Sequence, residues 1–345
     1  MGCRHVPDVS GAAQDADGTE PDLGVAADGG DVVDSRVDLQ AVVAVVGEIE
    51  AIVRTFVAES PWQCAGMLLG LVHINMGSMS RPDDLVVAAR AAEAAGFDSL
   101  WAGEHIVLPD PQLPPSPMDP RDPALDSLLA LTWAAAHTTT IRVVTGIVIL
   151  PQRNPLVLAK QVATLDVLSA GRVTLGVGAG YLEPEFRALG ANFAERGAVT
   201  DEYLDAVRAL WYAEHPEYHG RFVDFAGVDA YPRPLQRPIP LVVAGHSAPA
   251  YRRAVTRAHG WYGYWLTPDD VVTSLAGLRA AADRVERPPE LGDLEISVTP
   301  RGRLTPERAA AFAELGVHRL VPLSAPTRDG PGESIEAALS AIAAL

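Results

Sequence analysis

The 345-residue chain has very little cysteine and no recognisable metal-binding spacing. Its two cysteines, Cys3 and Cys64, cannot build a disulfide framework, and cytosolic proteins commonly use cysteine this sparingly. The histidines stand singly, without the His-x-His or His-Glu-x-x-His patterns that bind zinc. No Gly-x-Ser-x-Gly elbow occurs either. The sequence therefore predicts neither a metal site nor a serine hydrolase.

Positive charge is also scarce. The chain carries 27 Lys and Arg against 44 Asp and Glu, a net charge of −17, and Lys160 is its only lysine. Nucleic-acid binding needs clustered basic residues, so we expect no nucleic-acid partner. A small anionic ligand is still permitted, because it needs only a few local donors.

Long apolar runs are missing as well. The run Ala41–Val57 is interrupted by Glu48, Glu50 and Arg54, so it does not qualify as a transmembrane helix. The start of the chain lacks a basic segment followed by a hydrophobic core, and no signal peptide is expected. With the cysteine usage, these features predict a cytoplasmic protein without a membrane partner.

Apolar residues nevertheless make up 48% of the chain, which is ample for a large core. Residues 1–66 differ from the rest. Ser10–Asp38 is rich in Asp, Gly and Ala without an apolar period and predicts a disordered acidic segment, while Asp38–Glu59 can form an amphipathic helix. This extension is either a regulatory tail or an upstream stretch before a fold that begins near Met67. Residues 67–345 are expected to form one catalytic domain.

From Leu68 onward, short apolar strands alternate with helical patterns. The expected strands are Leu69–Ile74, Asp98–Trp101, Arg142–Ile149, Val173–Val177, Leu241–Ala244, Gly263–Leu266, Leu294–Val298 and Arg319–Leu323. The expected helices are Pro82–Ala95, Asp126–His137, Pro155–Leu168, Pro184–Leu189, Thr200–Ala213, Ala248–His259, Pro268–Arg284 and Pro306–Leu315. Ser80 is the expected N-cap of the first helix, and Gly96 ends it. A Pro-rich loop at Leu108–Pro123 and a hairpin at Gly220–Tyr231 interrupt the alternation.

This alternation predicts right-handed βαβ units that close into a (β/α)8 TIM barrel with insertions. The alternative is an open doubly wound sheet, whose glycine-rich fingerprint should follow the first strand. That position reads HINMG, His73 to Gly77, which favours the barrel.

Side chains that follow the strands are the candidates for chemistry, because active sites of such barrels lie at the carboxyl ends of the strands. His105 is the strongest, since a histidine titrates near neutrality and can exchange a proton with a substrate. Glu104 beside it would orient it or accept a proton itself. His73 is either a hydrogen-bonded lining residue or a contact to substrate or cofactor.

Two glycine-containing turns follow strands and precede helical segments. They are Gly178-Ala179-Gly180 and Gly245-His246-Ser247. Exposed amides at such turns favour an anion, with help from the helix dipole, although glycines there also serve packing. Arginines that could add charge to a phosphate, or simply lie on the surface, are Arg153, Arg187 and Arg196.

Several longer segments occur together in a fixed order. They are Ala94–His105, Leu150–Leu156, Thr164–Arg172, Leu175–Gly178, Glu185-Phe186, Arg196-Gly197 with Asp201-Glu202, Pro238–Gly245 and Arg252–Ala254. With these segments the chain resembles the bacterial luciferase-like superfamily of flavin and deazaflavin enzymes over about Leu68 to Leu323. The sequences of these segments are most similar to those of the branch of probable coenzyme F420-dependent oxidoreductases.

The resemblance implies an oxidoreductase that passes a hydride between F420 and a small organic substrate, with Glu104-His105 as the acid–histidine pair. It also implies a non-proline cis peptide at Gly146–Ile147 that bulges against the deazaflavin ring. The loop Gly178–Tyr181 and the turn Gly245–Ser247 would contact the rest of the cofactor. Tyr181 stands where the family's sugar-phosphate dehydrogenases have a catalytic glutamate, so a sugar phosphate is not the expected substrate.

Two alternatives stay open on the sequence. One is a reduced-FMN-dependent monooxygenase on the same fold, and the other is a non-catalytic flavin-binding scaffold. Because members of the superfamily commonly dimerise through barrel helices, a homodimer is expected, with the helix Asp126–His137 as a candidate interface. The loop Leu108–Pro123 is a candidate lid.

Overall fold

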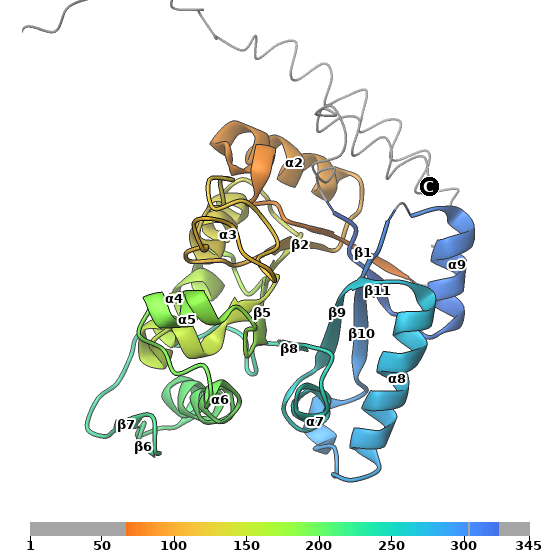
Figure 1. The fold of residues 1–345 in the computed structure, drawn as a ribbon. Helices are drawn as coiled ribbons and strands as arrows, with labels where there is room; N and C mark the ends of the chain where they lie inside the picture. Colours follow the sequence, from red (N-terminus) through yellow and green to blue (C-terminus); the bar gives the residue numbers. More distant parts are fainter. Residues whose placement is uncertain (1–66, 303, 324–345) are drawn as a thin grey trace, which may run out of the picture. The chain divides into compact units, whose positions relative to one another are not determined.

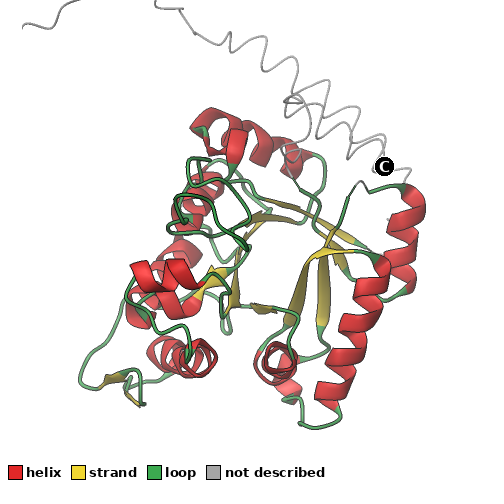
Figure 2. Ribbon diagram, viewed as in Figure 1, coloured by secondary structure: helices red, strands yellow, loops and turns green. Residues whose placement is uncertain are grey.

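The structure is a computed structural model, which describes residues 67–302 and 304–323. The predicted acidic extension and its helix at Asp38–Glu59 lie outside the described residues. The boundary expected near Met67 stays a prediction. In Figure 2 the long strands of the larger sheet lie at the centre and helices surround them.

Nine of the described strands form a closed parallel barrel (Figure 1). They are β1 (Leu68–Val72), β2 (Ser99–Ala102), β3 (Arg142–Thr145), β4 (Val148–Ile149), β5 (Val173–Gly178), β8 (Leu241–Ala244), β9 (Gly260–Leu266), β10 (Glu295–Pro300) and β11 (Arg319–Leu320). Strand β3 pairs with both β2 and β5, which closes the ring, and β3 and β4 share one position, so the nine strands occupy eight places. The predicted (β/α)8 barrel is confirmed.

The helices follow the strands as expected. They are α2 (Pro82–Ala94), α3 (Ser127–Ala136), α4 (Pro155–Leu168), α5 (Glu183–Ala188), α6 (Arg196–Tyr212), α7 (Ala248–Arg257), α8 (Pro268–Ala282) and α9 (Pro306–Glu314). Asp126 and Asn154 each accept two backbone N–H groups at the starts of α3 and α4, which explains why these helices begin there. The prediction of Ser80 as the N-cap of α2 is wrong. Arg81 is the N-cap of α2, because the Ser80 hydroxyl donates to Gly77 within the short helix η2 (Gly77–Ser80).

The third strand is not continuous, contrary to the prediction of one strand over Arg142–Ile149. It breaks at Gly146–Ile147. The Gly146 N–H still donates to the Ala102 carbonyl of β2 at 2.6 Å, but on the β5 side the Thr145 hydroxyl, and not the backbone, bonds to the N–H and carbonyl of Gly176. The cis peptide expected at this break is absent: among the described residues every cis bond precedes a proline, so Gly146–Ile147 is trans. The resemblance correctly pointed to a bulge here and wrongly to its peptide geometry.

A second local correction concerns the hairpin between α6 and β8. Its arms are β6 (Tyr218–His219) and β7 (Asp224–Phe225), so the hairpin begins before the predicted Gly220 and ends well before Tyr231, with residues 220–223 as its turn. Glu202 on α6 explains the position of the turn, because its carboxylate accepts the N–H groups of Phe222 and Val223. The Pro-rich segment Leu108–Pro123 has neither helix nor strand, as expected.

The barrel interior is apolar in the middle and polar at its amino-terminal end. The apolar cluster consists of Val72, Trp101, Val144, Val242, Tyr262 and Val321. Arg319 lies on β11, two residues before Val321. It donates to Asp98 and Ser297 and pairs with Glu295. Buried polar groups at this end are therefore satisfied within the fold, which makes it a stable floor beneath the mouth.

Two findings concern the surface. Helix α3 exposes Leu129 and Trp133, with 72% and 47% of their surface accessible, and the dimer interface predicted at this helix stays a prediction. Among the described residues no helix is long and apolar enough to cross a membrane.

Candidate active site

The predicted site residues come together at one end of the barrel. His73 follows β1, Glu104 and His105 follow β2, Tyr181 follows β5, and the turn at Gly245 follows β8. Because all the barrel strands are parallel, their carboxyl ends share a single rim. All these positions therefore lie at the mouth of the barrel, while their catalytic and cofactor-binding roles stay predictions.

His105 faces a buried carboxylate that the sequence analysis did not assign. Its Nδ1 lies 3.5 Å from Oε2 of Glu185 on α5, and the two side chains are only 10% and 0% exposed. Neither atom has a hydrogen-bond partner among the described residues. The other Glu185 oxygen, Oε1, accepts the N–H of Ile106 at 2.7 Å. Glu185 is thus fixed by the residue next to His105 and presents its free oxygen to the imidazole.

Two tyrosines complete the surroundings of this pair. The Tyr181 ring stands edge-on to the His105 ring, with 6.2 Å between the centroids, and its side chain is half exposed. Burial, and then the nearby Glu185 carboxylate, raise the pKa of Tyr181. Burial, with a further contribution from Tyr181, raises the pKa of Tyr264 to about 12. Both phenols therefore stay protonated near neutral pH and can donate hydrogen bonds.

His73 has a different role from His105. It adopts a left-handed backbone conformation, with φ 63°, and its ring lies against Tyr264 with 5.6 Å between centroids. Burial, with a smaller contribution from the nearby His105, lowers the pKa of His73 to about 4. His73 is therefore neutral at the pH where an imidazole normally exchanges protons. It lines the mouth without adding charge.

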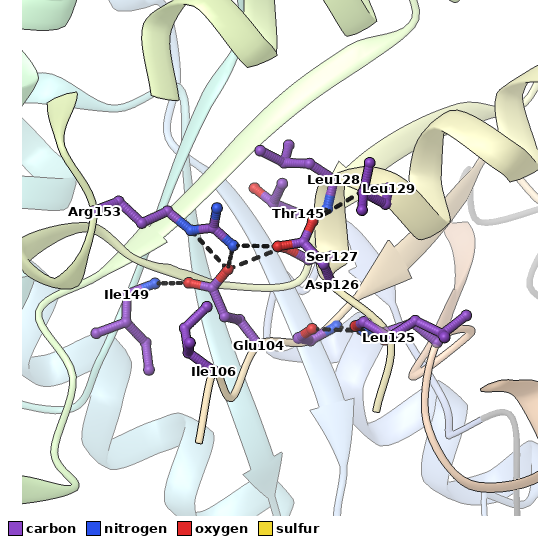
Figure 3. Close-up of polar contacts among 12 residues, drawn as sticks. Glu104, Ile106, Leu125, Asp126, Ser127, Leu128, Leu129, Thr145, Ile149 and Arg153 are labelled. Carbon is purple, nitrogen blue, oxygen red and sulfur yellow. Dashed lines mark hydrogen bonds and ion pairs between the residues drawn. The ribbon is translucent and has the colours of Figure 1, made fainter. Parts of the chain in front are cut away.

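Glu104 belongs to a separate cluster, in which the Arg153 guanidinium lies between two carboxylates (Figure 3). Arg153 donates through Nε to Glu104 at 3.0 Å and through Nη2 both to Glu104 and, at 2.7 Å, to Asp126. Glu104 also accepts the Ile149 N–H at 2.8 Å and the Ser127 hydroxyl at 3.2 Å. Both Glu104 oxygens are therefore occupied by donors within the fold.

This geometry corrects the expectation that the Glu104 carboxylate orients the His105 ring by direct contact. The residues are adjacent in sequence, but Glu104 bonds to Arg153 while His105 faces Glu185. A proton-accepting role for Glu104 stays a prediction. Arg153, considered as a donor to a phosphate, is instead committed to carboxylates.

The loop after β5 needs its small residues. A Cβ atom on Gly178 would lie 2.8 Å from Ile147 Cγ2, so the break in the third strand and this loop pack directly together. Gly180, beyond Ala179, has φ 78°, and its carbonyl accepts from Arg196. Arg196 therefore braces the loop. Cofactor contacts from these residues stay a prediction.

The turn after β8 is built around its glycine. Gly245 has φ 128°, a conformation that side-chain-bearing residues rarely adopt, and its carbonyl accepts the indole N–H of Trp261. His246 is exposed and stands edge-on to the same indole. The Ser247 hydroxyl accepts the Ala250 N–H as the N-cap of α7. Because β5 pairs with β8, this turn neighbours the Gly178 loop, as the prediction of a shared cofactor seat requires.

Glu185 and Tyr264 are the residues that sequence reasoning missed. Glu185 lies in one of the matched segments, Glu185-Phe186, so a signal was present without a role attached to it. Tyr264 sits inside an apolar strand and carries no signal of its own. Among the described residues no group of three or more His, Cys, Asp or Glu side chains is placed to hold a metal ion.

The comparison with protein families decides the class of the chain. The model of the luciferase-like monooxygenase family matches residues 65–340. The chain belongs to this family. It is therefore an oxidoreductase or monooxygenase, as the members of the family and its structural neighbours are.

The proteins that are similar to this luciferase-like enzyme differ from one another in the cofactor that their names give. An uncharacterised Mycobacterium tuberculosis protein is 35% identical over 247 residues, 67% of this chain and 83% of its own. An FMNH2-dependent dimethylsulfone monooxygenase of Pseudomonas putida is 34% identical over 130 residues, 37% of this chain and 36% of its own. An F420-dependent secondary alcohol dehydrogenase structure has a TM-score of 0.64 at 17% identity, covering 81% of this chain and 99% of its own. At that identity, the last likeness supports the fold alone.

Proposed function

We propose that this luciferase-like enzyme is an F420-dependent oxidoreductase in which His105 exchanges the proton that accompanies hydride transfer. The observation that carries the proposal is the buried His105–Glu185 pair, whose facing atoms have no other hydrogen-bond partner among the described residues. A buried carboxylate is costly unless a positive charge faces it. The free Glu185 oxygen therefore faces the imidazole that would exchange the proton.

Such a pair suits the interconversion of an alcohol and a carbonyl compound. When bound, the deazaflavin would supply the acceptor or donor for the hydride, and the hydroxyl proton would go to or come from His105. Glu185 orients the imidazole and stabilises its charged form. Ile106, through its N–H to Glu185, holds the carboxylate in place.

The residues at the mouth fit a flat ring cofactor. Gly178 admits Ile147 at a distance that no Cβ would tolerate, so the wall formed by these two residues can be smooth and close-packed. On the other side, Tyr264 and the neutral His73 offer ring faces without charge. The amides of Gly178–Gly180 and Gly245–Ser247 are the candidates for the anionic part of the cofactor. These residues would bind the cofactor, while His105 and Glu185 handle the proton.

Titration of the purified protein with F420 and, separately, with FMN tests the cofactor. We expect F420 to bind, with its fluorescence as the readout, and FMN to bind far more weakly. The P. putida relative supports the second candidate, a reduced-FMN-dependent monooxygenase. Tight FMN binding without F420 binding would contradict the proposal and favour that candidate. If F420 binds but no alcohol of a broad panel reduces it, the result would favour a non-catalytic scaffold.

A further inference from the structure

Arg153 joins three chain segments that lie far apart in sequence. Its guanidinium contacts Glu104 in the loop after β2 and Asp126 at the start of α3, while Arg153 itself follows η3 (Leu150–Gln152). Glu104 in turn accepts the N–H of Ile149 in β4. One cluster thus ties together the β2 loop, the end of the Pro-rich segment and the interrupted third strand, as Figure 3 shows.

The cluster is buried and charged. The side chains of Glu104 and Arg153 are 2% and 14% exposed. Burial would raise the pKa of Asp126, but Arg153 and the N–H groups of Leu128 and Leu129 outweigh it and lower the pKa. One guanidinium therefore holds two carboxylates, and the amino-terminal end of α3 helps to balance the charge of Asp126.

The segment Gly103–Ile106, which carries His105, is held on both sides of the histidine. Before it, Asn75 bonds both to the carbonyl and to the N–H of Gly103, and Glu104 is held by Arg153. After it, the Ile106 N–H is held by Glu185. Between these two anchors, Nδ1 of the His105 ring is buried and has no hydrogen-bond partner among the described residues.

We propose that Arg153 is a positioning residue for His105, acting through Glu104, and that Glu104 serves this clamp and does not itself exchange protons. This inference rests on the proposed function only for the identity of His105 as the proton-transfer group. The fork of the guanidinium matters, because two carboxylates must be held at once at fixed angles. A lysine would supply the charge without the fork.

The kinetic experiment compares Arg153→Gln with Arg153→Lys and with Arg253→Gln. Arg253 on α7 is also buried, with 4% of its side chain exposed against 14% for Arg153, and it pairs with Asp201 on α6, so it matches the loss of a buried ion pair. We expect both glutamine variants to melt at lower temperature. Only Arg153→Gln should also lose turnover, by about 100-fold in kcat with little change in F420 affinity, because the histidine is misplaced. Arg153→Lys should recover part of the loss.

A second measurement is independent of turnover. The ring signals of His105, assigned with a His105→Asn variant, are followed by NMR in the cofactor-free protein. We expect them to broaden or double in Arg153→Gln and to stay sharp in Arg253→Gln. Glu104→Gln, which keeps the shape of the side chain and removes its charge, replaces Arg153→Gln if that variant does not fold. It should disturb the same signals.

Unchanged His105 signals, with a fall in kcat no larger than in Arg253→Gln, would overturn the proposal. Disturbed signals in Arg153→Gln, together with a wild-type enzyme that shows no F420 activity, would uphold the clamp and reject the proposed function. The two inferences can therefore fail separately.

Discussion

Two buried glutamates flank the same histidine and have opposite surroundings. Glu104 has both oxygens occupied by a guanidinium, a hydroxyl and a backbone N–H. Glu185 is as deeply buried, yet one oxygen holds a backbone N–H and the other faces only His105 among the described residues. Residue type and burial are the same, so the difference lies in the partners.

That difference separates two uses of a buried carboxylate. A fully paired carboxylate holds chain segments together, and removing one partner leaves a costly uncompensated charge. A carboxylate with an unmatched oxygen can instead stabilise a charge that appears during a reaction. The mouth of this barrel contains one of each, on the two sides of His105. Four substitutions test whether these two carboxylates at the mouth have different functions.

The largest effect is expected for His105→Ala. Without the imidazole the proton has no carrier next to Glu185, so turnover should fall by about 10²- to 10⁴-fold. F420 affinity should change little, which fluorescence titration can check beside steady-state rates. Unchanged turnover would remove His105 from its proposed role.

Glu185→Gln should have the next largest effect. The amide keeps the shape of the side chain but cannot stabilise an imidazolium, and hydrogen bonds to charged groups contribute about 1.5–3 kcal/mol. This corresponds to a fall in kcat of about 10- to 100-fold, with KM almost unchanged.

The matched control is Glu93→Gln. Glu93 lies away from the mouth, where its carboxylate accepts the N–H groups of Thr139, Thr140 and Ile141. This control should lower the melting temperature without lowering kcat. Equal kinetic effects in the two variants would argue against a special role for Glu185.

The third prediction concerns His73 and the pH dependence of stability. Its pKa of about 4 in the fold lies below the ordinary value of 6.5, so the unfolded chain binds a proton that the folded chain refuses. The free energy of unfolding should therefore fall as the pH drops from about 6.5 to about 4, by up to about 3 kcal/mol from this group. His73→Asn should flatten that part of the curve, measured by urea unfolding. The exposed His219→Asn should not, and a similar flattening there would refute the assignment.

The smallest effect is expected for Ser127→Ala. Its hydroxyl donates one of several bonds to Glu104, so its loss should cost about 1 kcal/mol of stability and leave kcat unchanged. Thermal unfolding and steady-state rates measure both quantities. A fall in kcat without a fall in stability would show that Glu104 takes part in the chemistry.

Patterns with local causes were predictable. The barrel follows from strands and helices that alternate along the chain, and α3 and α4 begin at Asp126 and Asn154, whose side chains cap their own helices. The prediction at Ser80 failed because its hydroxyl found a partner inside η2. Periodicity alone missed the break at Gly146, which only the resemblance indicated, because Thr145 bonds there to Gly176 on another strand.

The sequence by itself determined the class of fold, the family and the position of His105 at the barrel mouth. These depend on local periodicity and on short ordered motifs. Only the tertiary structure decided which acid serves which base, because Glu104 is one residue from His105 and Glu185 is 80 positions further along the chain. The nearer glutamate bonds to Arg153 and the distant one meets the histidine, because contacts between elements, and not distance along the chain, place these side chains.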